Sequence, residues 1–253
     1  MAADRNAPEA AAGGCRAASL SEPVAGAFRG AQRRPTVVLL LSTLLTATWW
    51  YFGSPEFYQA ALSGRLPFGE GKAWAAAYSF LACFVLLGLL PLAVVRFAFR
   101  DSLSDYGVTL GDRVRTVRCT LLFAPFFLLA AFIGARDAAL QEVYPLNPAA
   151  GSSGSAFVLH AAFYALFYLG WEFHFRGFLQ MGLRGSIGPV NALLVQTLAS
   201  CLLHLGKPAV ETFAAIPAGI FWGLLVYRTG SLLAPILLHV LLGVALDAMI
   251  LWW

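Results

Sequence analysis

The sequence predicts an all-α fold, a polytopic bundle of about seven transmembrane helices. Of its 253 residues, 59% are hydrophobic and only 12% are charged, and the mean hydropathy is +0.72. These values lie far from those of soluble domains. Stretches without Asp, Glu, Lys or Arg also recur along the chain at lengths close to the ~20 residues that a helix needs to cross a bilayer. The composition therefore argues against a disulfide scaffold and against a nucleic-acid-binding protein.

The uncharged stretches give the expected membrane helices in order. They cover residues 35–55, 73–95, 119–135, 143–171, 185–206, 212–227 and 229–246. Their apolar runs show no alternation of apolar and polar residues, so they favour helices over the strands of a membrane barrel. Residues 1–35 are rich in Ala and Gly and lack a long apolar run, which predicts a disordered cytoplasmic tail before a transmembrane domain over residues 36–253.

The basic residues predict the orientation. If the N-terminus is cytoplasmic, the opposite side of the membrane holds only Arg65, Lys72, Arg136 and Lys207, and the other 13 of the 17 Lys and Arg lie inside. The positive-inside rule therefore favours a cytoplasmic N-terminus and an external C-terminus. The net charge of +4 is explained by this distribution and does not require a nucleic-acid partner.

Ionisable residues are concentrated in the helices of the second half. Glu172, Arg176, His204, His239 and Asp247 lie within or at the ends of apolar stretches, where an unpaired charge is costly and a polar group is usually functional. Glu172 and Arg176 have the spacing of an ion pair on one helix face, and that pair could be purely structural. His160 and His174 lack an obvious partner and are interpreted as core or interfacial residues.

Three of these side chains are predicted to meet. A turn is expected at residues 185–189, with Glu172 fifteen residues before Ile187 and His204 seventeen residues after it, so both lie at a similar depth. His239 lies nine residues beyond Gly230 and is also expected inside the bilayer. One carboxylate and two imidazoles in a wet cavity are suited to general-base hydrolysis.

The motifs resemble those of the CAAX protease and bacteriocin-processing family of intramembrane endopeptidases. That family has Glu-Glu-x-x-x-Arg, then Phe-x-x-x-His, then His-x-x-x-Asn or Asp, on successive helices. The matching residues here are Trp171-Glu172-Phe173-His174-Phe175-Arg176, Ser200-Cys201-Leu202-Leu203-His204, and Tyr227-Arg228-Thr229-Gly230-Ser231-Leu232 leading to His239. The resemblance covers residues 155–253, and Asp105-Tyr106-Gly107 with Leu110-Gly111 in the second cytoplasmic connection is also similar to the family.

The chain departs from the family pattern at three positions. Trp171 stands where the family usually has its first glutamate, the residue generally assigned as the water-activating base. Ser200 replaces the Phe of the second motif, and Gly243 stands where the final Asn or Asp is expected. Asp247, one helical turn further, either compensates for Gly243 or is a helix-end carboxylate.

The resemblance implies peptide-bond hydrolysis in a membrane-anchored substrate in the bacterial inner membrane. Glu172 would activate water, Arg176 would hold its carboxylate, and His204 and His239 would position the water or stabilise the oxyanion. Lys207 and Glu211 would close the cavity on one side. We expect no cofactor, because no His-Glu-x-x-His helix is present, although zinc held by the two histidines and the glutamate is an alternative.

The expected orientation places the site near the external surface. It therefore favours C-terminal sorting signals over CAAX-type substrates, which would approach from the cytoplasm. The alternatives are an inactive family member that serves as a membrane scaffold or immunity protein, and a transporter with a proton relay, for which the sequence shows no inverted repeat.

Overall fold

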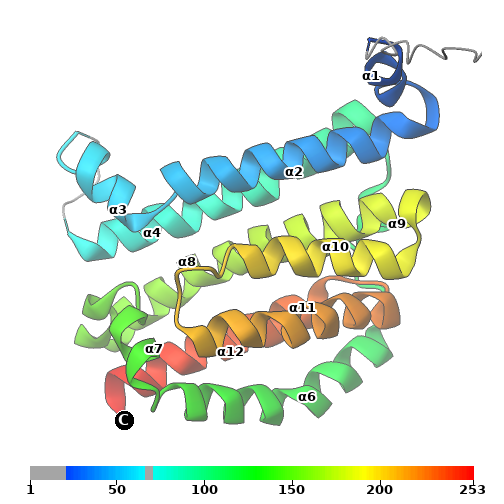
Figure 1. Ribbon diagram of the computed structural model, residues 1–253. Coiled ribbons are helices and arrows are strands. Elements are labelled where there is room, and N and C mark those ends of the chain that lie inside the picture. The colour runs from blue at the N-terminus through cyan, green and yellow to red at the C-terminus, as the bar shows by residue number, and fades with distance from the viewer. Residues whose placement is uncertain (1–20, 66–70) are drawn as a thin grey trace, which may run out of the picture.

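The structure is a computed structural model that describes residues 21–65 and 71–253. All regular structure in these residues is helical, which confirms the all-α prediction (Figure 1). Within the described residues, six helices are long and apolar enough to cross a membrane and a seventh, α10, is shorter, so the expectation of about seven is confirmed with one helix of reduced length. The predicted tail reaches residue 35. Its residues 1–20 lie outside the described residues, and the remainder includes helix α1 (Ser21–Ala27).

The membrane helices follow one another along the chain with short connecting elements. The long elements are α2 (Arg33–Phe52), α4 (Lys72–Cys83), α6 (Arg113–Gly134), α8 (Gly154–Glu172), α10 (Pro189–Leu202), α11 (Ala209–Thr229) and α12 (Leu233–Trp252). The α4 helix continues through α5 (Leu90–Ala93) to Phe99, and α8 continues through a π-helical segment, Phe173–Met181, into α9 (Gly182–Ile187). Two short helices lie in connections, α3 (Pro55–Phe57) and α7 (Ala138–Val143).

The fourth membrane helix differs from the uncharged stretch that predicted it. The stretch covers residues 143–171, whereas the helix runs from Gly154 to Ile187. Glu172 and Arg176 therefore lie in the middle of a span. Their charges compensate each other there, so counting uncharged residues places the end of this helix too early.

Glycine and proline set the two turns that arrange the second half of the bundle. Gly188 has φ +83°, and Pro189 then occupies the first turn of α10, which confirms the predicted hairpin. Gly230, with φ +69°, ends α11 in a left-handed conformation. After it, α12 runs back through the bundle and carries His239.

A close helix crossing fixes the height of α8. A Cβ added at Gly170 would lie 2.7 Å from the carbonyl oxygen of Cys83 and 2.8 Å from the Cα of Phe84. Gly88 faces Gly170 in the same crossing, with its added Cβ 3.0 Å from the Gly170 Cα. Small residues thus let the two backbones touch, as is common between membrane helices. The crossing immediately precedes Trp171 and Glu172, and it sets their position.

The connection before α6 is bonded to the turn before α12. The backbone N–H of Leu232 donates to the Gly107 carbonyl at 3.0 Å, and the N–H of Asp112 donates to the Thr229 carbonyl at 3.1 Å. The hydroxyl of Ser231 donates to the Thr109 carbonyl. Two of the segments that resemble the family therefore contact each other.

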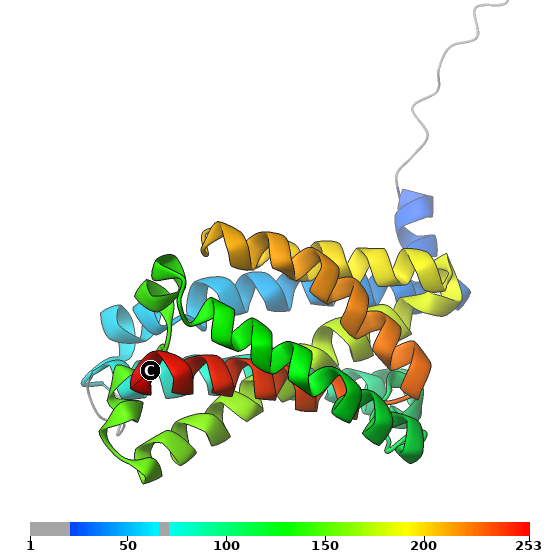
Figure 2. The ribbon, with the colours of Figure 1, turned by 90° about the horizontal axis from the view of Figure 1, so that it is seen from below.

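The helices run roughly along one direction, so the molecule has two ends. One end holds α1, α9 and the Gly230 turn, together with most of the arginine-rich connections, and the other holds α3, α7 and the C-terminus (Figure 1). Viewed from below, α6 lies along α12 (Figure 2). Because α10 has only 14 residues, the loop between α10 and α11 begins partway along the bundle (Figure 1).

Candidate active site

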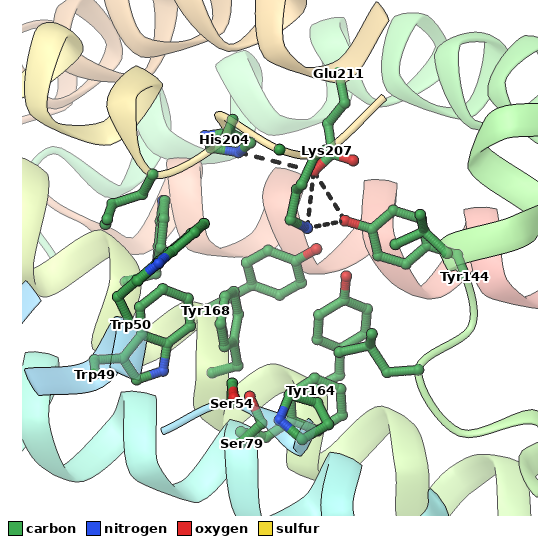
Figure 3. A pocket seen from close by; sticks show the side chains of 18 of the residues that line it. Trp49, Trp50, Ser54, Ser79, Tyr144, Tyr164, Tyr168, His204, Lys207 and Glu211 are labelled. Carbon is green, nitrogen blue, oxygen red and sulfur yellow. Dashed lines mark hydrogen bonds and ion pairs between the residues drawn. The ribbon is translucent and has the colours of Figure 1, made fainter. Parts of the chain in front are cut away.

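A cavity of about 510 Å³ opens among the elements of the second end (Figure 3). Aromatic side chains form much of its lining, and a polar group of four residues lies at one side of it. The aromatic residues are Trp49, Trp50, Phe80, Tyr144, Tyr164, Phe167, Tyr168 and Trp171, and the polar group is His204, Lys207, Glu211 and His239. Charged and neutral hydrogen-bonding groups are thus collected against an apolar surface, as in most small-molecule and substrate sites.

Glu172 and His239 form a direct pair between α8 and α12. Oε1 of Glu172 lies 2.7 Å from Nδ1 of His239, and Arg176 Nη1 lies 3.4 Å from the same oxygen. The Glu172 side chain is completely buried, whereas the His239 side chain is 18% exposed and lines the cavity. Because an ionised carboxylate only accepts hydrogen bonds, Nδ1 carries the proton and Nε2 is the nitrogen left for other partners. Glu172 contacts the cavity only through His239.

The His239 ring is held in place by two aromatic rings. Trp222 stacks on it at 5.2 Å between centroids with an interplanar angle of 19°, and Tyr168 lies 4.3 Å from it. A ring fixed by a carboxylate and by stacking has little orientational freedom. His239 is therefore preorganised toward the cavity.

His204 is oriented by its own backbone turn. Its Nδ1 lies 2.7 Å from the Ser200 carbonyl oxygen, which can only accept, so Nδ1 carries the proton. In the neutral ring Nε2 is then an acceptor, and this atom lies 3.9 Å from Oε1 of Glu211. The ring edge also packs on Trp171 at 5.6 Å between centroids. His204 reaches the cavity as predicted, but its carboxylate neighbour is Glu211 and not Glu172.

Glu211 is the centre of a second polar group. It accepts the Tyr144 hydroxyl at 2.8 Å, and Lys207 Nζ lies 3.0 Å from the same oxygen, Oε1. Lys207 also donates to the Tyr144 hydroxyl. Burial and the nearby Glu211 charge raise the pKa of Tyr144 well above its usual value, so its hydroxyl keeps its proton and donates. The expectation that Lys207 and Glu211 stand at the cavity agrees with this geometry.

Asp247 lies apart from the cavity. It is buried and accepts from Nε2 of His160 at 2.7 Å, which makes it a partner of a core histidine. His174 is fully buried beside Phe175 and Phe178, and its ring nitrogens have no hydrogen-bond partner among the described residues. Both histidines therefore belong to the core, as the sequence suggested.

The structure explains two departures from the family pattern in physical terms. Trp171 is buried, lines the cavity, and stacks on Phe167 at 5.5 Å. An indole thus stands at the cavity in place of a carboxylate. At Gly243 an added Cβ would lie 2.1 Å from the Tyr168 hydroxyl oxygen, so Tyr168 fills the space that a side chain at this position would need.

Three tyrosines that line the cavity, Tyr144, Tyr164 and Tyr168, were missed by sequence reasoning. Tyr168 belongs to an aromatic series on one face of α8, with Tyr164, Phe167 and Trp171 at helical spacing, and this series was a usable signal. Tyr144 lies in a connection far from Glu211 in sequence. Nothing in its local pattern indicates that contact.

The donor atoms do not form a compact metal site. Among residues 21–65 and 71–253, no group of three or more His, Cys, Asp and Glu side chains converges as metal ligands do. The pairs Glu172–His239 and Glu211–His204 each engage their own partners.

Fold and site together define a polytopic helical membrane protein with two carboxylate–imidazole pairs beside an aromatic cavity. Residues 152–245 match the family model described as type II CAAX prenyl endopeptidase Rce1-like. The match confirms the resemblance to the CAAX protease and bacteriocin-processing family over the region that holds Glu172, His204 and His239. It supports a hydrolase that cleaves peptide bonds. No curated protein and no solved structure matches the chain.

Proposed function

We propose that the protein is an intramembrane endopeptidase that hydrolyses a peptide bond in a membrane-anchored protein. The observation that carries the proposal is that His204 and His239, from separate elements, both open onto one cavity and are each oriented by a partner on Nδ1. The family match supports peptides as the substrate class. A substrate carbonyl between the two rings would meet a bound water on one side and a hydrogen-bond donor on the other.

In this proposal His239 stabilises the oxyanion. Glu172 lies 2.7 Å from its Nδ1, and Arg176 compensates the buried carboxylate. This role needs a proton on Nε2 as well as on Nδ1, so that Nε2–H donates to the developing negative charge. Glu172 is then a positioning residue that acts through His239. Replacing it with Gln removes the negative charge but keeps the shape.

The substrate approaches from the arginine-poor end. The cavity is lined by the end of α2, by the connection around Tyr144 and by the loop before α11, all away from the arginine-rich connections. With the N-terminus cytoplasmic, this end faces outward. C-terminal sorting helices of exported proteins therefore fit the site better than prenylated cytoplasmic proteins.

The test uses the purified full-length protein in liposomes with two quenched fluorescent peptides. One ends in an apolar helix of about 20 residues, and the other ends in an S-farnesyl cysteine followed by a short apolar C-terminus. We expect cleavage of the first peptide, with the bond mapped by mass spectrometry, and at least a tenfold smaller rate for the second. Cleavage of neither peptide by the wild-type protein would contradict the proposed function.

The metal-free reaction is tested in the same assay. We expect the rate to be unchanged after incubation with a zinc chelator. A loss of activity that returns when Zn²⁺ is added would contradict it, since catalytic zinc is removed by chelators and restored by the metal.

A catalytically inactive membrane scaffold is the second candidate. It is favoured by Trp171, whose indole stands at the cavity beside His204. The two candidates differ in one result, because a scaffold leaves both peptides intact whatever the pH or lipid.

A further inference from the structure

The proposed hydrolysis requires a group that accepts a proton from water, and Glu172 is poorly placed for it. Its side chain is completely buried and it is absent from the cavity lining. A general base must lie within hydrogen-bond reach of the water from which it takes a proton. Two carboxylates line the cavity, those of Glu56 and Glu211, and only Glu211 belongs to the polar group around His204.

Glu211 has the contacts that such a base requires. Its side chain is 19% exposed, and Oε1 lies 3.9 Å from His204 Nε2. That separation is too long for a hydrogen bond, but one water can lie about 2.8 Å from each atom, at the apex of a triangle. Such a water would donate one hydrogen to the neutral imidazole and one to the carboxylate, which leaves a lone pair free for attack.

The two carboxylate oxygens of Glu211 differ in their partners. Oε2 is buried and has no hydrogen-bond partner among the described residues, although a buried carboxylate oxygen normally has one. Tyr144 and Lys207 donate to Oε1 and hold the group in place (Figure 3). His204, Lys207, Tyr144 and Tyr168 are titratable groups around this carboxylate.

We propose that Glu211 is the carboxylate that takes the proton from the hydrolytic water, an inference that rests on the proposed function. One O–H bond of the water breaks, its proton passes to Glu211, and the oxygen forms a bond to the substrate carbonyl carbon. The oxyanion is held by Nε2–H of His239. When the C–N bond breaks, the proton on Glu211 moves to the leaving nitrogen, so an acid and an amine are released and the carboxylate is restored.

The experiment measures kcat and KM for whichever peptide the wild-type protein cleaves. For Glu211→Gln we expect kcat to fall by about 10²–10⁴-fold with KM nearly unchanged, as for removal of a general base. Glu142→Gln, an exposed carboxylate on α7, is the matched control and should keep the wild-type rate. Thermal unfolding of each variant in detergent shows that it is folded.

A second variant separates chemistry from structure. Glu211→Ala leaves space beside the cavity for a small carboxylate, and we expect added formate to raise its rate at least tenfold, while formate leaves the wild-type rate unchanged. Glu211→Gln with more than a tenth of the wild-type kcat, or folded Glu211→Ala without formate rescue, would overturn the inference alone. Absence of cleavage by the wild-type protein would overturn the proposed function and this inference together.

Discussion

At the scale of single residues, two carboxylate–imidazole pairs with different exposure lie beside the cavity. The Glu172–His239 pair has a fully buried carboxylate and a direct contact of 2.7 Å, whereas the Glu211–His204 pair is partly exposed and separated by 3.9 Å. The tight pair is suited to fixing the orientation of a ring, and the open pair leaves room for a water between its two members. The environment of each pair therefore assigns its role in the proposed mechanism.

Tyr144→Phe tests how Glu211 is held. The variant keeps the ring and removes the hydroxyl that donates to Glu211 at 2.8 Å, while Lys207 remains. Because the lost hydrogen bond is worth about 1 kcal/mol, we expect a five- to tenfold lower kcat with little change in fold. Tyr51→Phe, at a tyrosine that is 70% exposed, should leave the rate unchanged. A wild-type rate for Tyr144→Phe in the peptide assay would contradict the prediction.

Gly243→Ala tests the explanation of the third motif. Its Cβ would lie 2.1 Å from the Tyr168 hydroxyl oxygen and 2.9 Å from the ring, so Tyr168 must move away from its position beside His239. We expect a loss of about 1–3 kcal/mol of stability, in the range of overpacked cores, measured by thermal unfolding in detergent. The double variant Gly243→Ala with Tyr168→Phe should recover part of the lost stability. Gly185→Ala, with no atom within 4 Å, is the control.

At the scale of elements, α8 is the helix that organises the site. Its crossing at Gly170 fixes the height at which Trp171 and Glu172 enter the bundle. Arg176, in the π-helical segment that follows, lies 3.4 Å from Glu172. Such segments are often found at functional sites. The short α10 then ends inside the bundle, and this places His204 at the cavity.

Gly170→Ala tests the crossing. The added Cβ would meet the backbone of Cys83 and Phe84, which has little room to yield. We therefore expect the free energy of unfolding to fall by about 1–3 kcal/mol. Gly154→Ala in the same helix has no atom within 4 Å and should unfold at the wild-type temperature. Equal unfolding temperatures for the two variants would show that the close crossing is unimportant.

Much of the fold was predictable from the sequence, because the bilayer imposes long uncharged helices and because Gly188 and Pro189 mark the hairpin. The end of the fourth helix was not predictable in this way, since the buried Glu172 and Arg176 resemble a helix end when read as sequence. His204 and His239 were predicted together at one site. The Glu211–Tyr144 contact joins residues 67 positions apart, and no local pattern encodes it.

At the scale of the whole molecule, the arginine residues and the cavity are distributed unequally between the two ends of the bundle. The arginine-rich connections lie at one end, and the elements that line the cavity lie toward the other. Since basic residues are retained in the cytoplasm, the cavity is expected to open to the exterior. In the proposed function, this orientation decides which membrane-anchored substrates reach the site.

Cysteine labelling tests this direction in cells. In a chain whose four natural cysteines are replaced, Ala209→Cys at the start of α11 and Ser186→Cys at the end of α9 introduce exposed thiols near opposite ends. A membrane-impermeant maleimide should label Ala209→Cys in intact cells and Ser186→Cys only after permeabilisation. The reverse pattern would place the cavity on the cytoplasmic side and favour prenylated substrates.

The central claim is that His204 and His239 act on the same substrate molecule in one cavity. A double-mutant cycle on kcat/KM, with His204→Ala, His239→Ala and the double variant, measures this directly in the peptide assay. Residues that work as a unit are strongly non-additive, so we predict that the double variant is within about tenfold of the slower single variant. Single variants that retain the wild-type rate, or whose effects simply multiply in the double variant, would contradict the claim.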